Sequence, residues 1–275
     1  MKKIILNASI FSLSLAFLTD CSKKSEVSSD QKVVRMAVEG TFPPFNFTDE
    51  NGNLAGFDVD IGKEICQELN WNCQFQAQKW DAMIPGLISQ QYDVIMSSMA
   101  ITEKRKKKVA FSNPYYTSGA IVVGRKDSPF EFTKAFLKGK KVGVTRASIF
   151  DSYVTEVWGD LVKISHYDTN DQQLMDLSSG RIDLAVSQST STHEWFKKRA
   201  DNNLEFKSKP FKDSRYMGIG AGIAVRKNEK EKWIPEINQA LEKIFSDGRY
   251  EKFNQKYLPF SIHPNTIVTD NLELK

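Results

Sequence analysis

Histidine and cysteine are scarce in this sequence, with three of each among 275 residues. The histidines are scattered through the chain, and the cysteines never occur with the C-x-x-C spacing of common metal and redox sites. The sequence also lacks a G-x-S-x-G turn, an H-E-x-x-H helix and a phosphate-binding glycine loop. These absences argue against an enzyme and against a bound metal or other cofactor.

Long apolar runs are missing beyond the N-terminal region, so no later segment reaches the roughly 20 apolar residues that a bilayer-spanning helix needs. At the N-terminus, Lys2 and Lys3 precede an apolar stretch over residues 4–18, which is typical of a short export signal. We therefore expect the chain to be exported and the part beyond Cys21 to be soluble.

The export signal ends in Leu18-Thr19-Asp20-Cys21, which resembles a bacterial lipoprotein box. In such a box the cysteine is lipidated and becomes the first mature residue. Asp20 departs from the pattern, because the residue before the cysteine is normally Gly, Ala or Ser. We expect residues 1–21 to be a signal peptide whose Cys21 receives a lipid anchor. Cleavage without lipidation, or retention of the segment, is the alternative.

Residues 22–32 are rich in serine, lysine and acidic residues, a composition typical of a flexible tether. The formal net charge of +4 is too small to indicate nucleic-acid binding. A lysine cluster at residues 104–108 has no interleaved aromatic residues that could stack on bases, so we interpret it as a solvated face. We expect membrane contact through the anchor only and no nucleic-acid partner.

The other two cysteines, Cys66 and Cys73, lie close together in the sequence, across the end of a predicted helix. Because disulfides persist in exported proteins, this pair is predicted to form a structural disulfide. Two reduced cysteines in the core are the alternative.

The body from residue 33 onward alternates short apolar runs with segments of helical periodicity. Strands are predicted at residues 33–38, 93–97, 119–123, 141–144, 183–186 and 222–225. Helices are predicted at residues 80–89, 148–158, 171–179 and 233–245. This alternation indicates an α/β protein whose open sheets carry helices on both faces.

A hairpin and a further helix are expected between the first two of these strands. Asn51-Gly52 lies between two short apolar runs and predicts a β-hairpin over residues 45–57. A following helix is predicted by apolar residues that recur every four positions, namely Ile61, Ile65 and Leu69. Asp58 or Asp60 is expected to cap this helix.

Polar residues follow four of the predicted strands, and ligands of open α/β sheets bind beyond the carboxyl ends of strands. These loops contain Glu39 and Phe42, Ser97 and Ser98, Thr145 and Ser148, and Gln188. They are the first places to look for a ligand site.

Arg105 follows Thr102, which is expected to open a short helix after the strand at residues 93–97. A guanidinium there can hold a carboxylate with two parallel hydrogen bonds. Ser148 lies where a loop enters a helix, so its hydroxyl and the free backbone amides form a second possible anion site. The alternatives are a surface arginine beside the lysines and an ordinary helix cap.

Glu39 lies near Phe42 in the sequence, and Trp80 begins another predicted helix. A carboxylate and two aromatic faces can hold a long cationic side chain, so this set predicts cation recognition. The alternative is that Phe42, Phe45 and Trp80 are core aromatic residues and that Glu39 is solvated.

Five motifs in matching order resemble the polar amino-acid family of periplasmic binding proteins that serve ABC importers (bacterial solute-binding protein family 3). The most similar members are the lysine/arginine/ornithine- and histidine-binding proteins. The motifs are G-F-D-V-D-I at residues 56–61, W-D-A-M-I-P-G-L at 80–87, I-T-E-K-R at 101–105, F-S at 111–112 and G-R-I-D at 180–183. The resemblance covers residues 33–259.

The resemblance implies a two-lobed periplasmic-binding-protein fold of type II, in which two hinge strands join α/β lobes that close on a ligand in the cleft. The hinges are expected near residues 117–119 and 219–221. The expected domains are residues 33–118 with 221–260 for the first lobe, 119–220 for the second, and 261–275 for a C-terminal tail.

By resemblance, Arg105 matches the arginine that holds the α-carboxylate of the ligand, and Ser148 matches a serine that assists from the other lobe. Glu39 falls where the relatives carry an Asp facing the cationic side chain, and Phe42 and Trp80 match the aromatic pair around it. The remaining matches are Ser97, Ser98 and Thr145 in the pocket wall and the disulfide pair Cys66 and Cys73.

Two positions depart from the family pattern. Ala100 stands where a Ser or Thr usually contributes a hydroxyl, and Gln188 stands where the family uses an Asp to receive the α-ammonium. Charged hydrogen bonds contribute about 1.5–3 kcal/mol and neutral ones about 0.5–1.5 kcal/mol, so the change at Gln188 would lower affinity about tenfold. Either Ser187 or Ser189 compensates, or the ligand lacks a free α-ammonium.

Residues and resemblance together predict a monomeric periplasmic binding protein that delivers an amino acid to an inner-membrane ABC permease. A cationic ligand is expected, with arginine first and then lysine, ornithine or histidine. One alternative is a neutral polar amino acid such as glutamine, whose amide could also bind Glu39. A dehydratase-type enzyme would need an acid/base pair, and a receptor's sensor domain would need a second membrane span or a signalling domain after residue 259.

Overall fold

A computed structural model describes residues 31–199 and 202–266 of the chain. The predicted signal peptide with Cys21, residues 22–30 of the predicted tether and residues 267–275 of the predicted tail lie outside the described residues. None of the helices in the described part combines the length and the apolar character that a membrane crossing requires.

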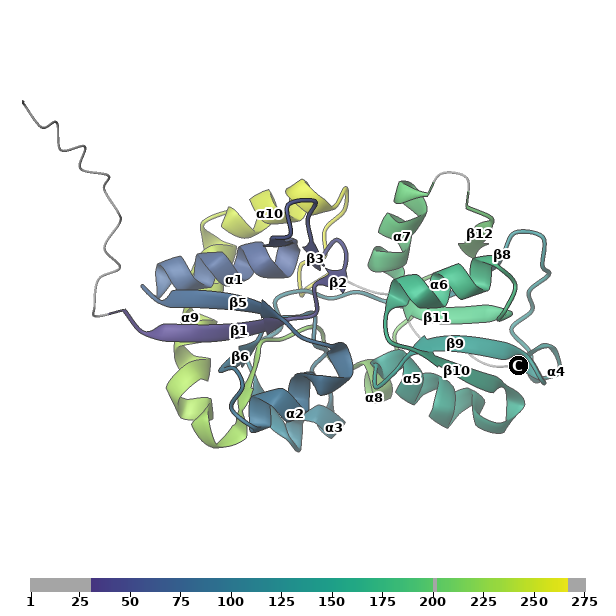
Figure 1. The fold of residues 1–275 in the computed structure, drawn as a ribbon, viewed down its shortest axis with the longest axis horizontal. Coiled ribbons are helices and arrows are strands. Elements are labelled where there is room, and N and C mark those ends of the chain that lie inside the picture. Colours follow the sequence, from purple (N-terminus) through teal and green to yellow (C-terminus); the bar gives the residue numbers. More distant parts are fainter. Residues whose placement is uncertain (1–30, 200–201, 267–275) are drawn as a thin grey trace, which may run out of the picture. The chain divides into compact units, whose positions relative to one another are not determined.

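The fold contains two five-stranded mixed sheets (Figure 1). The first has the order β5-β1-β6-β13-β7. Its strands are β1 (Val33–Val38), β5 (Asn72–Ala77), β6 (Val94–Ile95), β7 (Val109–Phe111) and β13 (Ala224–Arg226). β1 is parallel to β5 and β6, whereas β13 runs antiparallel to β6 and β7.

Successive residues of β1 face two separate hydrophobic cores, because side chains alternate between the faces of a sheet. Met36 and Val38 pack with residues of two long helices, whereas Ala37 packs with a short helix. The helices of this part are α1 (Phe57–Glu68), η1 (Trp80–Ala82), α2 (Met83–Ile88), α3 (Glu103–Lys106), η4 (Lys227–Glu229), α9 (Lys230–Ser246) and α10 (Arg249–Tyr257). Both faces of the first sheet are therefore buried.

The second sheet has the order β10-β9-β11-β8-β12 and is likewise covered by helices. Its strands are β8 (Ala120–Arg125), β9 (Lys141–Thr145), β10 (Lys163–Tyr167), β11 (Leu184–Gln188) and β12 (Leu204–Phe206). Its helices are α4 (Lys134–Leu137), α5 (Ile149–Tyr153), the π-helical turn η2 (Val154–Trp158), η3 (Gly159–Leu161), α6 (Asn170–Ser178), α7 (Ser189–Lys198) and α8 (Ser214–Met217).

A small antiparallel sheet follows β1 and consists of β2 (Thr41–Phe42), β3 (Asn46–Thr48) and β4 (Leu54–Ala55). The predicted hairpin is confirmed, since β3 pairs with β4 across the turn that contains Asn51-Gly52. The predicted caps of α1 are wrong, because Gly56 is the N-cap residue and no side chain caps the helix. Asp58 points into the interior, and Asp60 accepts a hydrogen bond from Tyr257.

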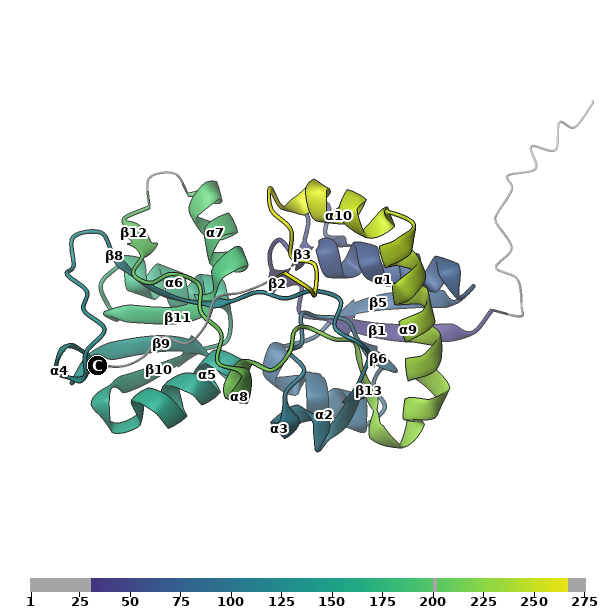
Figure 2. The same cartoon turned by 180° about the vertical axis from the view of Figure 1, so that it is seen from behind.

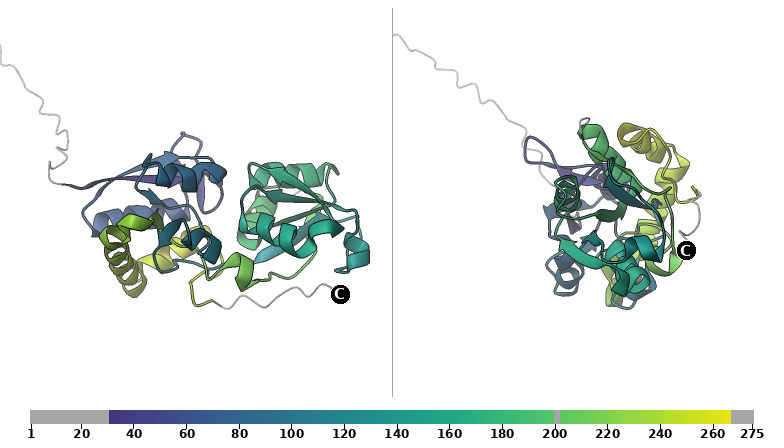
Figure 3. Two further views of the ribbon diagram at one scale, coloured as in Figure 1. Left: turned by 90° about the horizontal axis from the view of Figure 1, so that it is seen from below. Right: turned by 90° about the vertical axis from the view of Figure 1, so that its right-hand side faces the viewer.

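The chain passes between the two sheets twice, from β7 to β8 and from β12 to β13 (Figure 2). Ala221 on the second passage forms isolated β-bridges with Tyr116 on the first and with Ala100. The elements of the two sheets form separate groups when they are viewed from below (Figure 3).

The strands and helices predicted from the sequence are confirmed in type, although several boundaries differ. β1 has the predicted bounds, whereas the strands predicted at residues 93–97 and 222–225 are shorter. The helix predicted at residues 80–89 begins with a 3-10 turn, and the one predicted at residues 148–158 ends in a π-helical turn. The elements that the sequence did not predict are β2, β5, β7, β10, β12, α4, α7, α8, α10 and the short turns η3 and η4.

Candidate functional site

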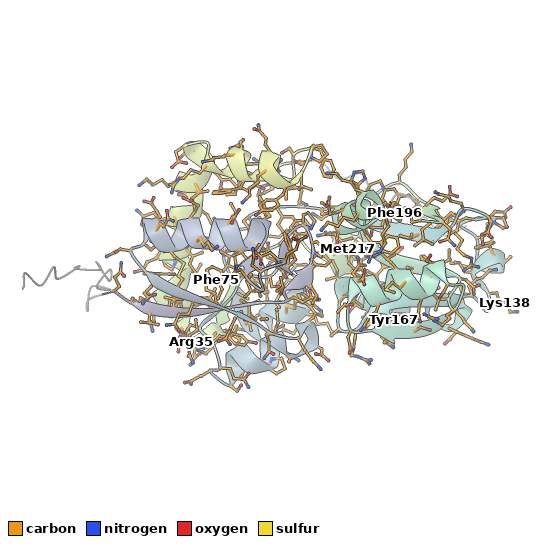
Figure 4. The ribbon with its side chains drawn as sticks, turned by 45° about the horizontal axis from the view of Figure 1, so that its top comes forward. Arg35, Phe75, Lys138, Tyr167, Phe196 and Met217 are labelled. Carbon is orange, nitrogen blue, oxygen red and sulfur yellow. A yellow bond between two sulfur atoms is a disulfide. The ribbon has the colours of Figure 1, made fainter. Side chains whose placement is uncertain are left out.

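One pocket collects the residues that follow strands of both sheets. Its wall includes all ten predicted ligand contacts, namely Glu39, Phe42, Trp80, Ser97, Ser98, Ala100, Arg105, Thr145, Ser148 and Gln188. The other lining residues are Tyr116, Ser118, Ala120, Ile149, Phe150, Asn170, Ser187, Lys212, Met217, Gly220 and Ala221. Met217 of this wall is labelled in Figure 4.

Arg105 lies in the short helix α3, which the side-chain oxygen of Thr102 caps. Only 9% of the residue is exposed, which excludes the alternative of a surface arginine. Its Nη1 donates to the carbonyl oxygen of Ala100 at 3.0 Å, and its Nη2 donates to that of Ala147 at 3.4 Å. Burial lowers the pKa of Arg105 to about 10, and no carboxylate of the described residues offsets this shift. A charged guanidinium without an anionic partner therefore lines the pocket.

The two aromatic residues predicted to enclose a cation also pack against the protein itself. The Cζ atom of Arg105 lies 5.1 Å from the centroid of the Trp80 ring, a distance typical of a cation–π contact. The ring of Phe42 stacks on Phe45 with centroids 5.7 Å apart. Phe42 and Trp80 thus help to position the wall in addition to lining it.

Glu39, directly after β1, is the only carboxylate among the described residues of the wall. Its Oε1 accepts a hydrogen bond from Thr41 Oγ1 at 3.0 Å, and its backbone N–H donates to Ser97 Oγ at 2.9 Å. Burial raises the pKa of Glu39 to about 7, and the nearby carboxylate of Asp58 adds to the increase. A bound cation would favour the ionised form of Glu39.

Behind the wall, the fully buried Asp58 fixes the loop that follows β6. It accepts hydrogen bonds from Asn46 Nδ2, Ser98 Oγ and Tyr115 Oη at 2.7–2.8 Å. Burial raises the pKa of Asp58 to about 6, although these three bonds oppose the increase. Ser98 itself has a left-handed backbone with φ of 53°, which Asp58 and Tyr115 hold in place. This loop leads into the helix that carries Arg105.

Ser148 caps α5 as predicted, because its Oγ accepts a hydrogen bond from the Asp151 N–H at 3.0 Å. The prediction of free backbone amides is wrong at two positions. The Ala147 N–H donates to Asp151 Oδ2 at 3.0 Å, and the Ser148 N–H donates to the Thr145 carbonyl at 3.2 Å. The hydroxyl proton of Ser148 remains a donor that this corner can offer to a ligand.

Gln188 ends β11 and caps α7. Its Oε1 accepts from the Ser191 N–H at 3.3 Å, and its Nε2 donates to Tyr116 Oη at 3.0 Å. At the other predicted departure, Ala100 presents a methyl group, and its carbonyl is occupied by Arg105.

Sequence reasoning did not assign five polar residues to the wall, namely Tyr116, Ser118, Asn170, Ser187 and Lys212. Tyr116, Ser118 and Lys212 lie on the passages between the sheets, where neither strand nor helix periodicity marks a position. Ser187 precedes Gln188, and the sequence indicates it only as a substitute for that residue. Ser187 Oγ donates to Asn170 Oδ1 at 2.5 Å, so this hydroxyl proton is already used.

Away from the pocket, a disulfide joins Cys66 near the end of α1 to Cys73 in β5, with Cα atoms 6.1 Å apart. The four lysines of the cluster at residues 104–108 are exposed. Among the described residues, no group of three or more His, Cys, Asp or Glu side chains is placed to hold a metal ion.

The pocket as a whole combines one carboxyl group, Glu39, with two cations, Arg105 and Lys212. It can therefore bind a small molecule with a carboxylate at one end and a cation at the other. None of these groups forms an acid/base pair with another lining residue by a hydrogen bond within the described structure.

Comparison with known proteins places the chain among binding proteins. Residues 34–260 match the sequence profile of the bacterial extracellular solute-binding proteins, family 3. The L-arginine-binding protein of Pseudomonas aeruginosa is 37% identical over 234 residues, which are 84% of this chain and 90% of that protein. The lysine/arginine/ornithine-binding periplasmic protein of Escherichia coli is 34% identical over 265 residues, which are 96% of this chain and 99% of that protein.

A solved structure of an ancestral arginine-binding protein bound to arginine has a TM-score of 0.76 and 36% identity to this chain. The match covers 82% of this chain and 98% of that one. The two-lobed α/β fold class predicted from the sequence is confirmed.

Proposed function

Because the chain belongs to the bacterial extracellular solute-binding proteins of family 3, we propose that its pocket captures an amino acid with a cationic side chain. Arginine is the preferred ligand, followed by lysine, ornithine and histidine. The observation that carries the proposal is a buried guanidinium, Arg105, that lacks an anionic partner and shares a pocket with the carboxyl group of Glu39. A ligand with a carboxylate and a cation would satisfy both charges.

At the carboxylate end, Arg105 forms a fork that can donate two parallel hydrogen bonds to the ligand. Ser148 adds a hydroxyl donor from the second sheet. A ligand carboxylate would displace the 3.4 Å bond from Arg105 to Ala147, which is the weaker of its two backbone bonds.

At the cation end, Glu39 can accept from a guanidinium or an ammonium, while Phe42 and Trp80 offer aromatic faces. Ser97 and Ser98 hold the neighbouring loop and supply oxygen atoms, and Thr145 forms part of the wall. Arginine fits this end best, since a planar guanidinium both stacks on aromatic rings and forms directed hydrogen bonds.

The protein would act in the periplasm and hand its ligand to an inner-membrane ABC permease, without catalysis and without a cofactor. The names of the relatives support this role, because those from Escherichia coli include a lysine/arginine/ornithine-binding periplasmic protein and an ABC transporter arginine-binding protein. A neutral polar amino acid such as glutamine is the second candidate, since an uncharged amide could also donate to Glu39.

Isothermal titration of protein that has been unfolded, washed and refolded tests the proposal. Arginine, lysine, ornithine, histidine and glutamine are titrated in turn, and arginine is expected to bind most tightly. The absence of binding heat with all four cationic amino acids would overturn the proposal. Tighter binding of glutamine than of arginine would favour the second candidate.

The proposal extends to the architecture, in which residues 33–118 with 221–260 form one lobe and residues 119–220 form the other. Each five-stranded sheet falls within one of these sets, which supports the division.

We further propose a monomer that is held at the membrane by a lipid on Cys21. Replacement of Cys21 by Ser should then abolish labelling of the protein with radioactive palmitate, and undiminished labelling of the variant would exclude a lipid at this cysteine.

A further inference from the structure

The orientation of the Gln188 amide is fixed by its contact with the N-terminus of α7. A backbone N–H can only donate, so the Gln188 atom that lies 3.3 Å from the Ser191 nitrogen is the oxygen. The Nε2 atom therefore faces the hydroxyl of Tyr116, at 3.0 Å, and both residues line the pocket. An amide NH₂ group carries two protons, and Tyr116 takes one of them. The second proton requires an acceptor, which an ammonium group cannot supply.

Lys212 adds a positive charge to the same wall. Phe211 bridges to Ala120, and Ala120 pairs with Gln188, so Lys212 directly follows the row of backbone pairs that ends at Gln188. The Nζ atom of Lys212 donates to Thr117 Oγ1 at 3.2 Å. No carboxylate of the described residues offsets the burial that lowers the pKa of Lys212.

The charges of the wall do not match free arginine. Arginine carries two cations, the guanidinium and the α-ammonium, whereas Glu39 is the only carboxylate among the described lining residues. Asp58, behind the wall, is occupied by hydrogen bonds from three side chains. Once Glu39 binds the guanidinium, an α-ammonium would be buried without an anion, and beside a second cation, which is strongly unfavourable.

We propose that the ligand for which this pocket is built is an arginine whose α-nitrogen is acylated. This inference rests on the proposed function, since it keeps the carboxylate on Arg105 and the guanidinium on Glu39. Acylation removes the charge of the α-nitrogen and adds a carbonyl oxygen. That oxygen accepts hydrogen bonds from the free amide proton of Gln188 and from the ammonium group of Lys212.

Titration of the refolded protein with L-arginine and with Nα-acetyl-L-arginine tests the inference. We expect the acetylated compound to bind at least about tenfold more tightly, because a charge-assisted bond to its carbonyl replaces an unpaired ammonium. If arginine binds as tightly as the acetylated compound or more tightly, this inference fails and the proposed function stands. If neither compound binds, both fail.

Gln188→Glu is the decisive variant, because it has the same length and keeps an oxygen for the Ser191 N–H, so the cap of α7 survives. It replaces the amide nitrogen by a second carboxylate oxygen. We expect arginine to bind about tenfold more tightly to this variant than to the wild type and the acetylated compound about tenfold more weakly. Gln172→Glu, an exposed glutamine in α6, makes the same charge change outside the pocket and should leave both affinities unchanged.

Lys212→Met supplies a second, independent measurement. The variant should lose about tenfold in affinity for the acetylated compound and none for arginine. Equal losses for both ligands would show that Lys212 only supports the wall, and would contradict its assigned contact with the acyl oxygen. If the Gln188→Glu variant is fully folded and still prefers the acetylated compound to arginine by the same factor as the wild type, the inference is overturned.

Discussion

Arg105 is buried and Glu39 is half-buried, and neither has an oppositely charged partner in the described structure. Arg105 keeps its proton in this environment, because even a pKa of about 10 leaves its guanidinium charged at neutral pH. A carboxyl group responds differently, since burial moves its pKa of about 7 into the physiological range. The two ends of the ligand should therefore differ in their dependence on pH.

Replacement of Glu39 by Gln should weaken arginine binding by about ten- to hundredfold, because a hydrogen bond to a charged group contributes about 1.5–3 kcal/mol. The affinity for citrulline, in which an uncharged urea group replaces the guanidinium, should change much less. Titration of both ligands against both proteins measures the difference. Equal losses for arginine and citrulline would show that Glu39 does not recognise the charge.

Arginine affinity should increase about tenfold between pH 6 and pH 8, since a bound guanidinium requires ionised Glu39 and the free carboxyl has a pKa of about 7. For the folding stability of the ligand-free protein, a rise in pH has the opposite effect. The raised pKa means that the native state holds its proton where the unfolded state has lost it, so this group's contribution to stability decreases as the pH rises from about 4.5 to 7. Titrations at several pH values test the first effect, and the affinity of the Glu39→Gln variant should change much less between pH 6 and pH 8.

Among the elements of the fold, the second passage between the sheets depends on Gly218 at the end of α8. Gly218 has φ of +68°, and a Cβ atom there would collide with the carbonyl oxygen of Ile101. Gly139 has a similar φ of +80° but open space around it. We expect Gly139→Ala to cost about 1–2 kcal/mol for the left-handed backbone, and Gly218→Ala at least about 2 kcal/mol more for the collision. Urea unfolding of both variants separates the two contributions, and equal losses would contradict the collision.

The disulfide connects the end of α1 to β5, an edge strand of the first sheet. The two cysteines are seven positions apart, so the closed loop is short and the bond should stabilise the fold by about 2–3 kcal/mol through the unfolded chain. Reduction should therefore lower the urea midpoint of the wild type. The double variant Cys66→Ser, Cys73→Ser should already unfold at the lower midpoint and should not respond to reductant.

The strands found from the sequence and those missed differ in how they are buried. β11 is buried at every position and reads as a continuous apolar run apart from its last residues. β5 and β10 are edge strands, each with polar residues and only partial burial, so neither periodicity nor composition identifies them. The loops after central strands could be predicted as pocket walls, because the apolar runs of those strands show where each strand ends. The positions of Lys212 and Tyr116 in the pocket could not be predicted, because both residues lie on the passages between the sheets, outside the named strands and helices.

For the whole molecule, the pocket is lined from hydrophobic cores of both sheets, which the described structure otherwise keeps separate. Glu39 and Arg105 come from the elements of the first sheet, whereas Ser148 and Gln188 come from those of the second. The 3.4 Å bond from Arg105 to the Ala147 carbonyl already joins the two groups. A ligand that contacts both groups should therefore stabilise the molecule as one unit.

Arginine or Nα-acetylarginine at about 100 times its dissociation constant should stabilise the native state by about 2.7 kcal/mol, because each binds the folded chain alone. For a chain of this size the melting temperature should rise by about 5–10 °C. Thermal unfolding followed by fluorescence measures the shift. Arg105→Met keeps much of the buried apolar volume but removes the carboxylate contact, so the same ligand concentration should shift its melting temperature by less than about 1 °C. A full shift in this variant would show that the ligand is held outside the pocket described above.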